Sequence, residues 1–479
     1  MREKKLNIVY MIVDQLRFDF LGINGNENID TPNLDMMGKY GYNFKNAYVS
    51  VPSCIAARAS IMTGMKPENH KRVGYEDGVD WDYENILAGV FARNGYHTQA
   101  IGKLHTYPQR NLLGFHNVIL HDGYLHSSRK MDKPFNSQYE SSDDYLKWLN
   151  NELKREVDLY DSGLSCNSWD ARPWELDEYL HPTNWVVSES IDFLRRKDPT
   201  KPFFLNMSFV RPHSPLNPPL YYFNEYKDRE VNDVFMGDWV EKKHEEYDID
   251  ARWGVLKPRY IKRARRAYSA LVSHLDNQIR RFLIALEESG ELENTIIIFS
   301  SDHGDLLGDH NLYRKYLAYE GSSHIPLIIY DPGKNLSDKE NFDIDEIVEL
   351  MDIMPSLLDM CGLEIPETVD GKSFLPLIRD ENVKWRKYVH GEHSYGKYSH
   401  HFIVSKNFKY IWYSQSGKEQ FFDLRDNHRE EVNEIDNKKF SEEIKEMRDF
   451  LIEELKDRQE GYSDGKKLIV GMKPVDTLD

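Results

Sequence analysis

The stretch CIAARASIMTG, residues 54–64, is the part of this chain from which its fold and chemistry can be worked out. It places Cys54 four residues before Arg58 and ends in Thr63 and Gly64. A lone cysteine is commonly a small buried apolar residue. A cysteine that attacks phosphate as a thiolate would need its arginine farther along the chain, so that one loop encloses the anion. The spacing therefore disfavours a thiolate phosphatase and leaves open either a structural or a chemically specialised cysteine.

Length and composition limit the kinds of protein that this can be. A chain of 479 residues predicts a large domain accompanied by a smaller one. The mean hydropathy is -0.67, and no run approaches the roughly 20 apolar residues that a membrane-spanning helix needs. The formal net charge of -18 argues against nucleic acid or an anionic membrane as a partner. The oligomeric state stays open.

The cysteines and the first residues bear on the cellular compartment. Cys54, Cys166 and Cys361 give no disulfide framework, which suits a reducing environment. The apolar run from Leu6 to Val13 has no small-residue cleavage site after it, so we interpret it as a buried first strand rather than a signal peptide. We therefore expect a cytoplasmic protein, although a precursor whose export signal has been removed fits as well.

Apolar β-rich runs alternate with helical patterns through the first three quarters of the chain. This alternation predicts an α/β fold with a large, mostly parallel sheet between helices, and active sites in such sheets gather at the carboxyl ends of the strands. The expected strands are 6–13, 97–101, 203–210, 295–300 and 325–330, and the expected helices are 34–40, 85–93, 185–196, 261–288 and 347–360.

Three regions depart from that alternation. Residues 107–182 and 214–260 look irregular, and we expect them to form walls of a substrate site, the alternative being solvated insertions. Beyond Leu377 the pattern predicts a smaller α+β domain with an antiparallel sheet. Its expected strands are 402–404, 410–413 and 421–424, and its expected helix is 441–458. The predicted domains are thus 1–377 and 378–479.

Two predicted strands end in groups that could bind a metal. Asp14 and Gln15 follow the first strand, and Asp302 and His303 follow the strand 295–300. Each acidic residue alone could be only a turn former or a helix cap. Together, two carboxylates, an amide oxygen and an imidazole can converge on one divalent cation, because hard cations prefer oxygen ligands and the imidazole widens the choice of metal.

An acidic chain that binds an anion needs a local basic pocket, and several basic residues follow strands. Lys103 and His105 follow the strand 97–101, His213 follows the strand 203–210, and Lys315 lies in a loop before the strand 325–330. A lone histidine is usually a hydrogen-bonded structural residue and a lone lysine is usually solvated. These four residues indicate an anion-binding pocket only when they are taken together.

Taken together, these motifs resemble those of the type I sulfatases, which belong to the alkaline-phosphatase superfamily. The resemblance covers about residues 6–377 and includes Cys-x-Ala-x-Arg, Gly-Lys-x-His at 102–105, and the turn at 370–373. Ala56 stands where proline is commoner, as in some bacterial sulfatases. The C-terminal part matches more loosely. The resemblance implies a large mixed, mostly parallel sheet between helices.

The resemblance also implies a mechanism. A maturation enzyme oxidises Cys54 to formylglycine, and one hydroxyl of the hydrated aldehyde attacks the sulfur of a sulfate ester. The covalent sulfate then leaves as the second hydroxyl loses its proton. The implied metal ligands are Asp14, Gln15, residue 54, Asp302 and His303. Calcium is the default metal, with manganese and magnesium as alternatives.

The remaining residues of the resembling motifs receive roles in binding and proton transfer. Lys103 and Lys315 would contact the sulfate, and His105 would hydrogen-bond the diol. His213 would lie at the ester oxygen, and either His213 or Lys315 could protonate the departing alkoxide. Arg58 would hold the diol and the metal-binding carboxylates in place.

These considerations predict a hydrolase of aryl or carbohydrate sulfate monoesters. Gln15 and His303 depart from the commoner Asp and Asn of the family, which keeps a phosphonate monoester or phosphodiester hydrolase as an alternative. A second alternative is a non-catalytic protein that binds sulfated ligands with Cys54 unconverted. The sequence does not distinguish an aryl group from a sugar as the alcohol half of the ester.

Overall fold

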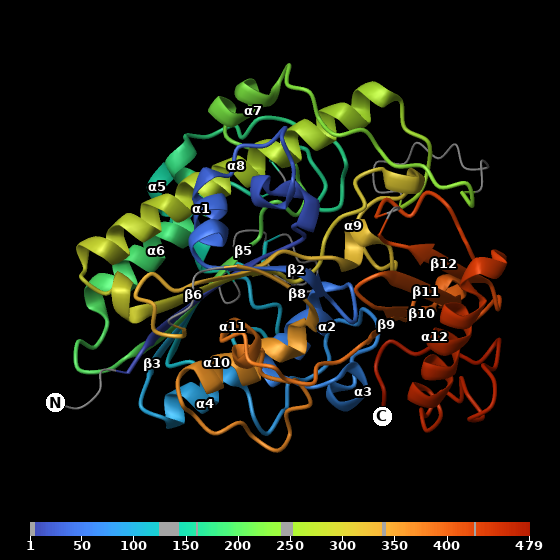
Figure 1. Cartoon of the computed structure of the whole chain (residues 1–479). Helices are drawn as coiled ribbons and strands as arrows, with labels where there is room; N and C mark the ends of the chain where they lie inside the picture. The colour runs from blue at the N-terminus through green and yellow to red at the C-terminus, as the bar shows by residue number, and fades with distance from the viewer. Residues whose placement is uncertain (1–4, 124–142, 160, 241–251, 338–341, 426–427) are drawn as a thin grey trace.

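The computed structural model describes residues 5–123, 143–159, 161–240, 252–337, 342–425 and 428–479 (Figure 1). Its main feature is a sheet of eight strands within these residues, in the order β4-β3-β5-β1-β6-β7-β2-β8. β7 runs antiparallel to β6 and β2, and the other pairings are parallel. The strands are β1 (Asn7–Val13), β2 (Tyr42–Tyr48), β3 (His97–Gly102), β4 (Asn117–Leu120), β5 (Phe203–Phe209), β6 (Thr295–Ser301), β7 (Leu327–Tyr330) and β8 (Asp343–Glu349).

Helices cover both faces of this sheet, as Figure 1 shows. Along β1, Ile8, Tyr10 and Ile12 point into one core and the residues between them point into the other, so that the whole strand is buried. Burying such side chains stabilises the fold by about 1.5–3 kcal/mol each. One face carries α1 (Pro32–Tyr40), α5 (Asp144–Leu153), α6 (Pro182–Arg196) and α8 (Pro258–Glu288); the other carries α2 (Cys54–Thr63), α4 (Leu87–Arg93), α10 (Ile353–Met360) and α11 (Leu375–Ile378).

A second, antiparallel sheet forms the C-terminal part, drawn in orange to red in Figure 1. One face packs against α12 (Ser441–Glu454), and the other, with Phe402 and Ile411, packs against Tyr48 and Tyr319 of the large unit. Its strands, in the order β12-β11-β10-β9, are β9 (Val389–His393), β10 (His400–Val404), β11 (Phe408–Tyr413) and β12 (Glu419–Asp423). The predicted fold class is confirmed, and the domain boundary at 377/378 stays a prediction.

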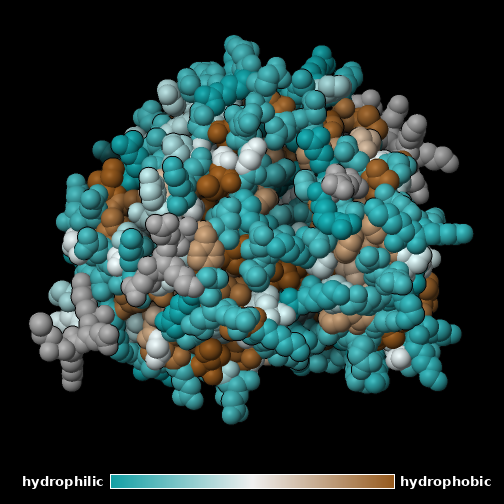
Figure 2. Space-filling model, viewed as in Figure 1, coloured by the Kyte–Doolittle hydropathy of each residue, from teal (hydrophilic) through white to brown (hydrophobic). Residues whose placement is uncertain are grey.

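The surface agrees with the composition. On the face drawn in Figure 2, hydrophilic residues dominate and hydrophobic residues form scattered patches. No helix among the described residues is long and apolar enough to cross a membrane.

Some predicted elements were wrong or missed. The helix expected at 347–360 begins only at Ile353, because Ile347 and Val348 belong to β8 and pair with β2. A capping box of Glu349 and Asp352 separates that strand from the helix. The expected helix 441–458 ends at Glu454. β2, β4, β8 and β9 were not predicted.

The two stretches expected to be irregular contain regular structure. The first holds β4 and α5, and the second holds α7 (Leu220–Tyr226) and the start of α8. Residues 124–142, 160 and 241–251 of these stretches lie outside the described part of the chain.

Candidate active site

The predicted site residues meet at the carboxyl ends of parallel strands. Asp14 follows β1, Lys103 follows β3 and Asp302 follows β6, while His213 lies four residues beyond the end of β5. Because these strands are parallel neighbours, their ends lie along one edge of the sheet. Cys54 is the first residue of α2 and is 2 % exposed.

Cys54 lies among charged and polar groups. Its Sγ is 3.2 Å from His303 Nε2, 3.2 Å from Lys315 Nζ and 3.7 Å from Asp14 Oδ1. Burial and Asp14 raise the pKa of the thiol, but Lys103, Lys315 and His303 outweigh them and hold it well below its usual value. The amino end of α2 adds a partial positive charge. The position therefore favours negative charge on residue 54.

Asp14 and Asp302 each have one oxygen tied to a cation and one directed inward. Asp14 Oδ2 is ion-paired with Lys103, and Asp302 Oδ2 lies 3.0 Å from both Nε and Nη2 of Arg58. The Oδ1 atoms lie 3.5 Å (Asp14) and 3.7 Å (Asp302) from His303 Nε2. Ligand atoms of Asp14, Cys54, Asp302 and His303 all fall within 4.8 Å of one another. This donor set fits a divalent cation.

The pKa values of the two carboxyl groups diverge. Burial raises the pKa of Asp14, but Lys103 and other nearby cations outweigh it and hold the pKa well below its usual value. Burial and the neighbouring Asp14 together raise the pKa of Asp302. Two buried carboxylates whose oxygens lie within 4.8 Å of each other repel, so a cation between them would stabilise both.

Gln15 connects the metal-binding motifs to Lys315. Its Oε1 accepts a hydrogen bond from Lys315 Nζ at 2.9 Å, its Nε2 donates to Asp305, and its backbone N–H donates to Asp302 Oδ1 at 3.1 Å. Its φ of 69° is in the left-handed region, which is uncommon for residues other than glycine. The role of Gln15 as a metal ligand stays a prediction, because its oxygen is directed to Lys315.

Arg58 is fixed by three partners. Besides Asp302, its Nη1 donates to the carbonyl of Lys103 at 2.8 Å and to Ser208 Oγ at 2.9 Å. It is 1 % exposed. Arg58 thereby joins the ends of β3, β5 and β6 below Cys54.

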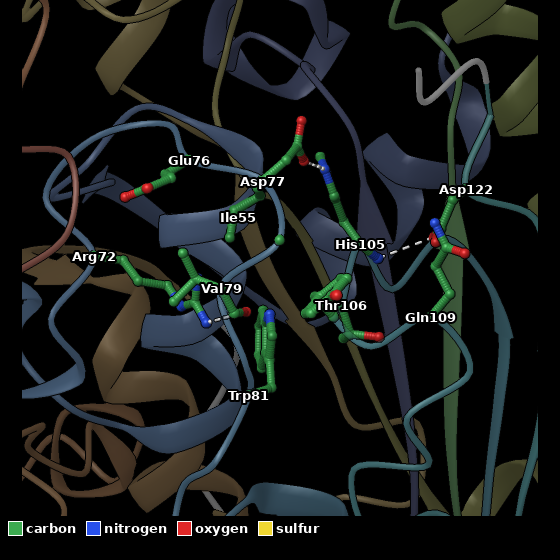
Figure 3. Close-up of a pocket in the computed structure, with 12 residues that line it drawn as sticks. Ile55, Arg72, Glu76, Asp77, Val79, Trp81, His105, Thr106, Gln109 and Asp122 are labelled. Atoms are coloured by element: carbon green, nitrogen blue, oxygen red, sulfur yellow. Dashed lines mark hydrogen bonds and ion pairs between the residues drawn. The ribbon is translucent and has the colours of Figure 1, made fainter. Parts of the chain in front are cut away.

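His105 is held by two acidic residues that the sequence did not indicate. Figure 3 shows its imidazole directed toward Asp77, with His105 Nε2 3.4 Å from Asp77 Oδ1, and its backbone N–H donating to Asp122 Oδ1 at 2.9 Å. Burial lowers the pKa of His105, but the hydrogen bonds to Asp77 and Cys54 outweigh it and raise the pKa. A cavity of about 20 Å³ lies beside this pair.

His213 and Lys315 form a hydrogen-bonded pair next to Cys54. His213 Nδ1 lies 2.8 Å from the carbonyl of Ser214, which can only accept, so Nδ1 carries the proton. His213 Nε2 therefore accepts from Lys315 Nζ, at 3.1 Å. Burial and Lys315 lower the pKa of His213 to about 3, which agrees with a neutral ring.

The structure thus brings all the predicted site residues into one connected group. Three other histidines have hydrogen-bond partners outside this group: His70 bonds Ser60, His310 accepts from the backbone of Gly237, and His324 bonds Glu320. Ser208, Asp77 and Asp122 were missed, since a single serine or aspartate in a strand or loop gives no distinctive signal.

Comparison with known proteins identifies the family of this chain. The family model described as "Sulfatase" matches residues 6–363, and one described as "N-sulphoglucosamine sulphohydrolase, C-terminal" matches residues 308–459. The chain belongs to the sulfatase family. Sulfatases hydrolyse sulfate esters, and membership implies a divalent metal and a formylglycine made from a cysteine. The predicted family and activity are confirmed.

Individual relatives of this sulfatase span nearly its whole length. It is 56 % identical over 477 residues to "Arylsulfatase" of Clostridium perfringens, covering 99 % of both chains. Among solved structures, one in complex with D-glucosamine-2-N,6-O-disulfate superposes with a TM-score of 0.75 at 21 % identity, covering 97 % of this chain and 100 % of the other. A phosphonate monoester hydrolase of Agrobacterium radiobacter also gives 0.75, at 22 % identity over 94 % and 95 % of the chains. These structural similarities concern the fold.

Proposed function

We propose that this sulfatase hydrolyses sulfate monoesters of an aryl or saccharide alcohol, using residue 54 after its conversion to formylglycine. The observation that carries the proposal is the position of Cys54 Sγ, within 3.7 Å of Asp14, His303 and Lys315. The name of the Clostridium perfringens relative supports an aryl ester, and the ligand of the structural neighbour supports a sugar ester.

The metal is proposed to be calcium, with manganese or magnesium as alternatives. The inward Oδ1 atoms of Asp14 and Asp302, the His303 imidazole, Gln15 and residue 54 would hold it. When bound, the ion would neutralise a sulfate oxygen and lower the pKa of the attacking hydroxyl. The carboxylate oxygens favour calcium, and the imidazole is the reason to keep manganese.

Residue 54 and the residues around it divide the remaining work. Formylglycine would supply a hydrated aldehyde, whose two hydroxyl groups allow attack on sulfur and subsequent release of sulfate. His105, held by Asp77, would hydrogen-bond that diol. Lys103 and Arg58 fix the outer oxygens of the two aspartates, so that their inner oxygens stay in place. Lys103 and Lys315 would also attract the sulfate.

Lys315 would supply the proton for the departing alkoxide. Its Nζ donates hydrogen bonds to Gln15 and to His213 Nε2 beside Cys54. His213 has no proton on Nε2 and a pKa lowered to about 3, so it would hold the Lys315 ammonium in place while Lys315 itself protonates the alkoxide. The three free cysteines support a reducing compartment, and we propose the cytoplasm.

The test requires converted protein, made by co-expression with a formylglycine-generating maturase. Mass spectrometry of the peptide containing Cys54 verifies conversion, and Cys54→Ala is the matched inactive control. We expect a higher kcat/KM for an aryl sulfate than for an aryl phosphonate monoester. A preference for the phosphonate would establish the alternative suggested by Gln15 and His303. Verified conversion without turnover of either ester would contradict catalysis and leave a sulfated-ligand binder.

A further inference from the structure

Arg252 packs against a pair of neighbouring tyrosine rings, whose centres are 5.5 Å apart, close to the active-site lysine. Its guanidinium carbon is 4.9 Å from the centre of the Tyr316 ring and 4.8 Å from that of Tyr395. Tyr316 directly follows Lys315 and is 9 % exposed. Tyr316 also makes an edge-to-face contact with Tyr75, at 6.2 Å from centre to centre. This aromatic group therefore lies next to Lys315.

The backbone of Arg252 is tied to the loop that carries Lys315. The carbonyl of Arg252 accepts from Tyr313 N–H at 2.9 Å, and Gly254 N–H donates to Asn311 at 2.9 Å. Trp253 forms a β-bridge with Leu312 between these two bonds. Arg252 therefore keeps a fixed position relative to Lys315.

Arg252 has no carboxylate partner in the part of the chain that the structure describes. Among the described residues, no carboxylate lies within ion-pair distance of it, whereas Arg58 is paired with Asp302 and Arg17 with Asp309. Arg252 is half-buried. Stacking on ring faces leaves the in-plane N–H groups of a guanidinium available for an anion. Such an arginine, with no acidic partner among residues 252–337 and the other described ranges, is a noteworthy feature in a chain whose net charge is -18.

Tyr316 contacts Arg252 with its ring and directly follows Lys315, whose Nζ lies 3.2 Å from Cys54 Sγ. Its pKa is raised by burial, which outweighs the lowering by Lys315; Cys54 raises it further and Arg252 lowers it. One side chain thus experiences the charges of both residue 54 and Arg252. A substrate whose sulfate lies at Cys54 would extend past Tyr316 toward Arg252.

We propose that Arg252 binds a second anionic group, a carboxylate or another sulfate, on the alcohol half of the sulfate ester. Sulfate esters of acidic saccharides or acidic aryl groups would then be preferred over neutral ones. Arg252 touches no reacting atom, so it determines specificity rather than catalysing the reaction. This inference rests on the proposed function, because it places the ester sulfate at residue 54.

The test compares matched substrate pairs on converted protein. One pair is 4-nitrophenyl sulfate and its ring-carboxylated analogue; the other is N-acetylglucosamine 6-O-sulfate and glucosamine-2-N,6-O-disulfate. For each pair, kcat and KM are measured for the parent and for Arg252→Gln. The ratio of variant to parent cancels differences in the intrinsic reactivity of the esters. The pair with the larger ratio identifies the anion as carboxylate or sulfate.

For Arg252→Gln we expect KM of the anionic substrates to rise roughly tenfold to a hundredfold, the range for a lost charge-assisted hydrogen bond, with kcat and the neutral substrates little changed. Arg252→Lys keeps the charge but loses the planar fork and should give an intermediate KM. The control is Arg259→Gln, which removes an exposed arginine that also stacks on a tyrosine, Tyr260, at the start of α8.

Equal changes for the anionic and neutral members of both pairs would overturn the inference and leave sulfate hydrolysis standing. A parent enzyme that turns over no sulfate ester would overturn both. If thermal melting shows that Arg252→Gln is unfolded, the comparison uses Arg252→Lys, for which an unchanged KM overturns the inference.

Discussion

Among the described residues, two groups of carboxylate and imidazole side chains gather possible metal-ligand atoms, and they differ in how their oxygens are used. In the C-terminal sheet, ligand atoms of His390, Glu392 and His401 lie within 4.8 Å of one another, as the ligand atoms around Cys54 do. There, Arg458 donates to both oxygens of Glu392, at 2.8 and 2.9 Å, and also to Glu460.

At the active site, by contrast, the lysine and the arginine pair with only the Oδ2 atom of each aspartate. The Oδ1 atoms of Asp14 and Asp302 remain directed at a common centre. The contrast teaches that a buried charge cluster can receive a ligand only where its internal pairing is incomplete. We therefore expect changes at the C-terminal cluster to affect stability, and changes at the strand ends to affect activity.

The largest effect is expected from Lys315→Ala. Removing Nζ deletes a cation near the sulfate and the proton donor beside His213, so kcat/KM should fall by roughly 10²–10⁴. The thermal midpoint should change little. Lys387→Ala, at an exposed lysine paired with Glu446, is the control. A variant within a factor of two of the parent would remove Lys315 from the site.

Arg458→Met should instead lower stability and leave activity unchanged. It leaves Glu392 and Glu460 buried without their partner, so the free energy of unfolding in urea should fall by about 3–5 kcal/mol. The folded fraction should keep the parent kcat. Loss of kcat without loss of stability would break the comparison, because it would make the C-terminal cluster part of the catalytic apparatus.

The ion pair between Arg458 and Glu392 should also make the free energy of unfolding depend on pH in acid. Burial raises the pKa of Glu392, but Arg458 outweighs it and lowers the pKa to about 2. Because the folded pKa lies below the unfolded value, the stabilisation is complete above the unfolded pKa and is lost as pH falls from there through the folded pKa. It amounts to roughly 3 kcal/mol. Glu392→Gln should therefore show a weaker decline in unfolding free energy below about pH 5 than the parent; an identical decline would contradict this.

The smallest effect concerns the metal. After chelation and dialysis, calcium at about a hundredfold excess over its Kd should stabilise the parent by about 2.7 kcal/mol, seen as a higher thermal midpoint. Asp302→Asn should lose this shift, and Glu392→Gln should keep it, since Glu392 has no oxygen left for an ion. Retention of the shift by Asp302→Asn would place the ion elsewhere.

The sequence predicted those elements that are buried through a continuous run of apolar side chains. β1 and β6 are buried throughout and were predicted nearly to the residue. β9 was missed because the half-buried His390 and the buried Glu392, both held by polar partners, interrupt its apolar pattern. β2 was missed because Asn43, Lys45 and Asn46 break up its apolar residues.

The site was predicted where residues belong to motifs at strand ends. Asp14 and Asp302 are of that kind, and Cys54 belongs to the motif that begins α2. Asp77 and Arg252 come from loops, and their contacts depend on how distant segments pack, as the β-bridge between Trp253 and Leu312 shows. Local patterns carry no information about such packing.

The 2 % exposure of Cys54 has a consequence for when the enzyme can become active. A maturase must contact the segment around the cysteine. In the finished fold that segment is the first turn of α2, and Cys54 Sγ lies 3.2 Å from Lys315 Nζ. We infer that conversion precedes folding, so the order of these two events fixes the active fraction of each batch of newly made chains. A peptide spanning residues 48–66 should be oxidised by the maturase, while folded unconverted protein should remain a thiol; oxidation of both at similar rates would refute this order.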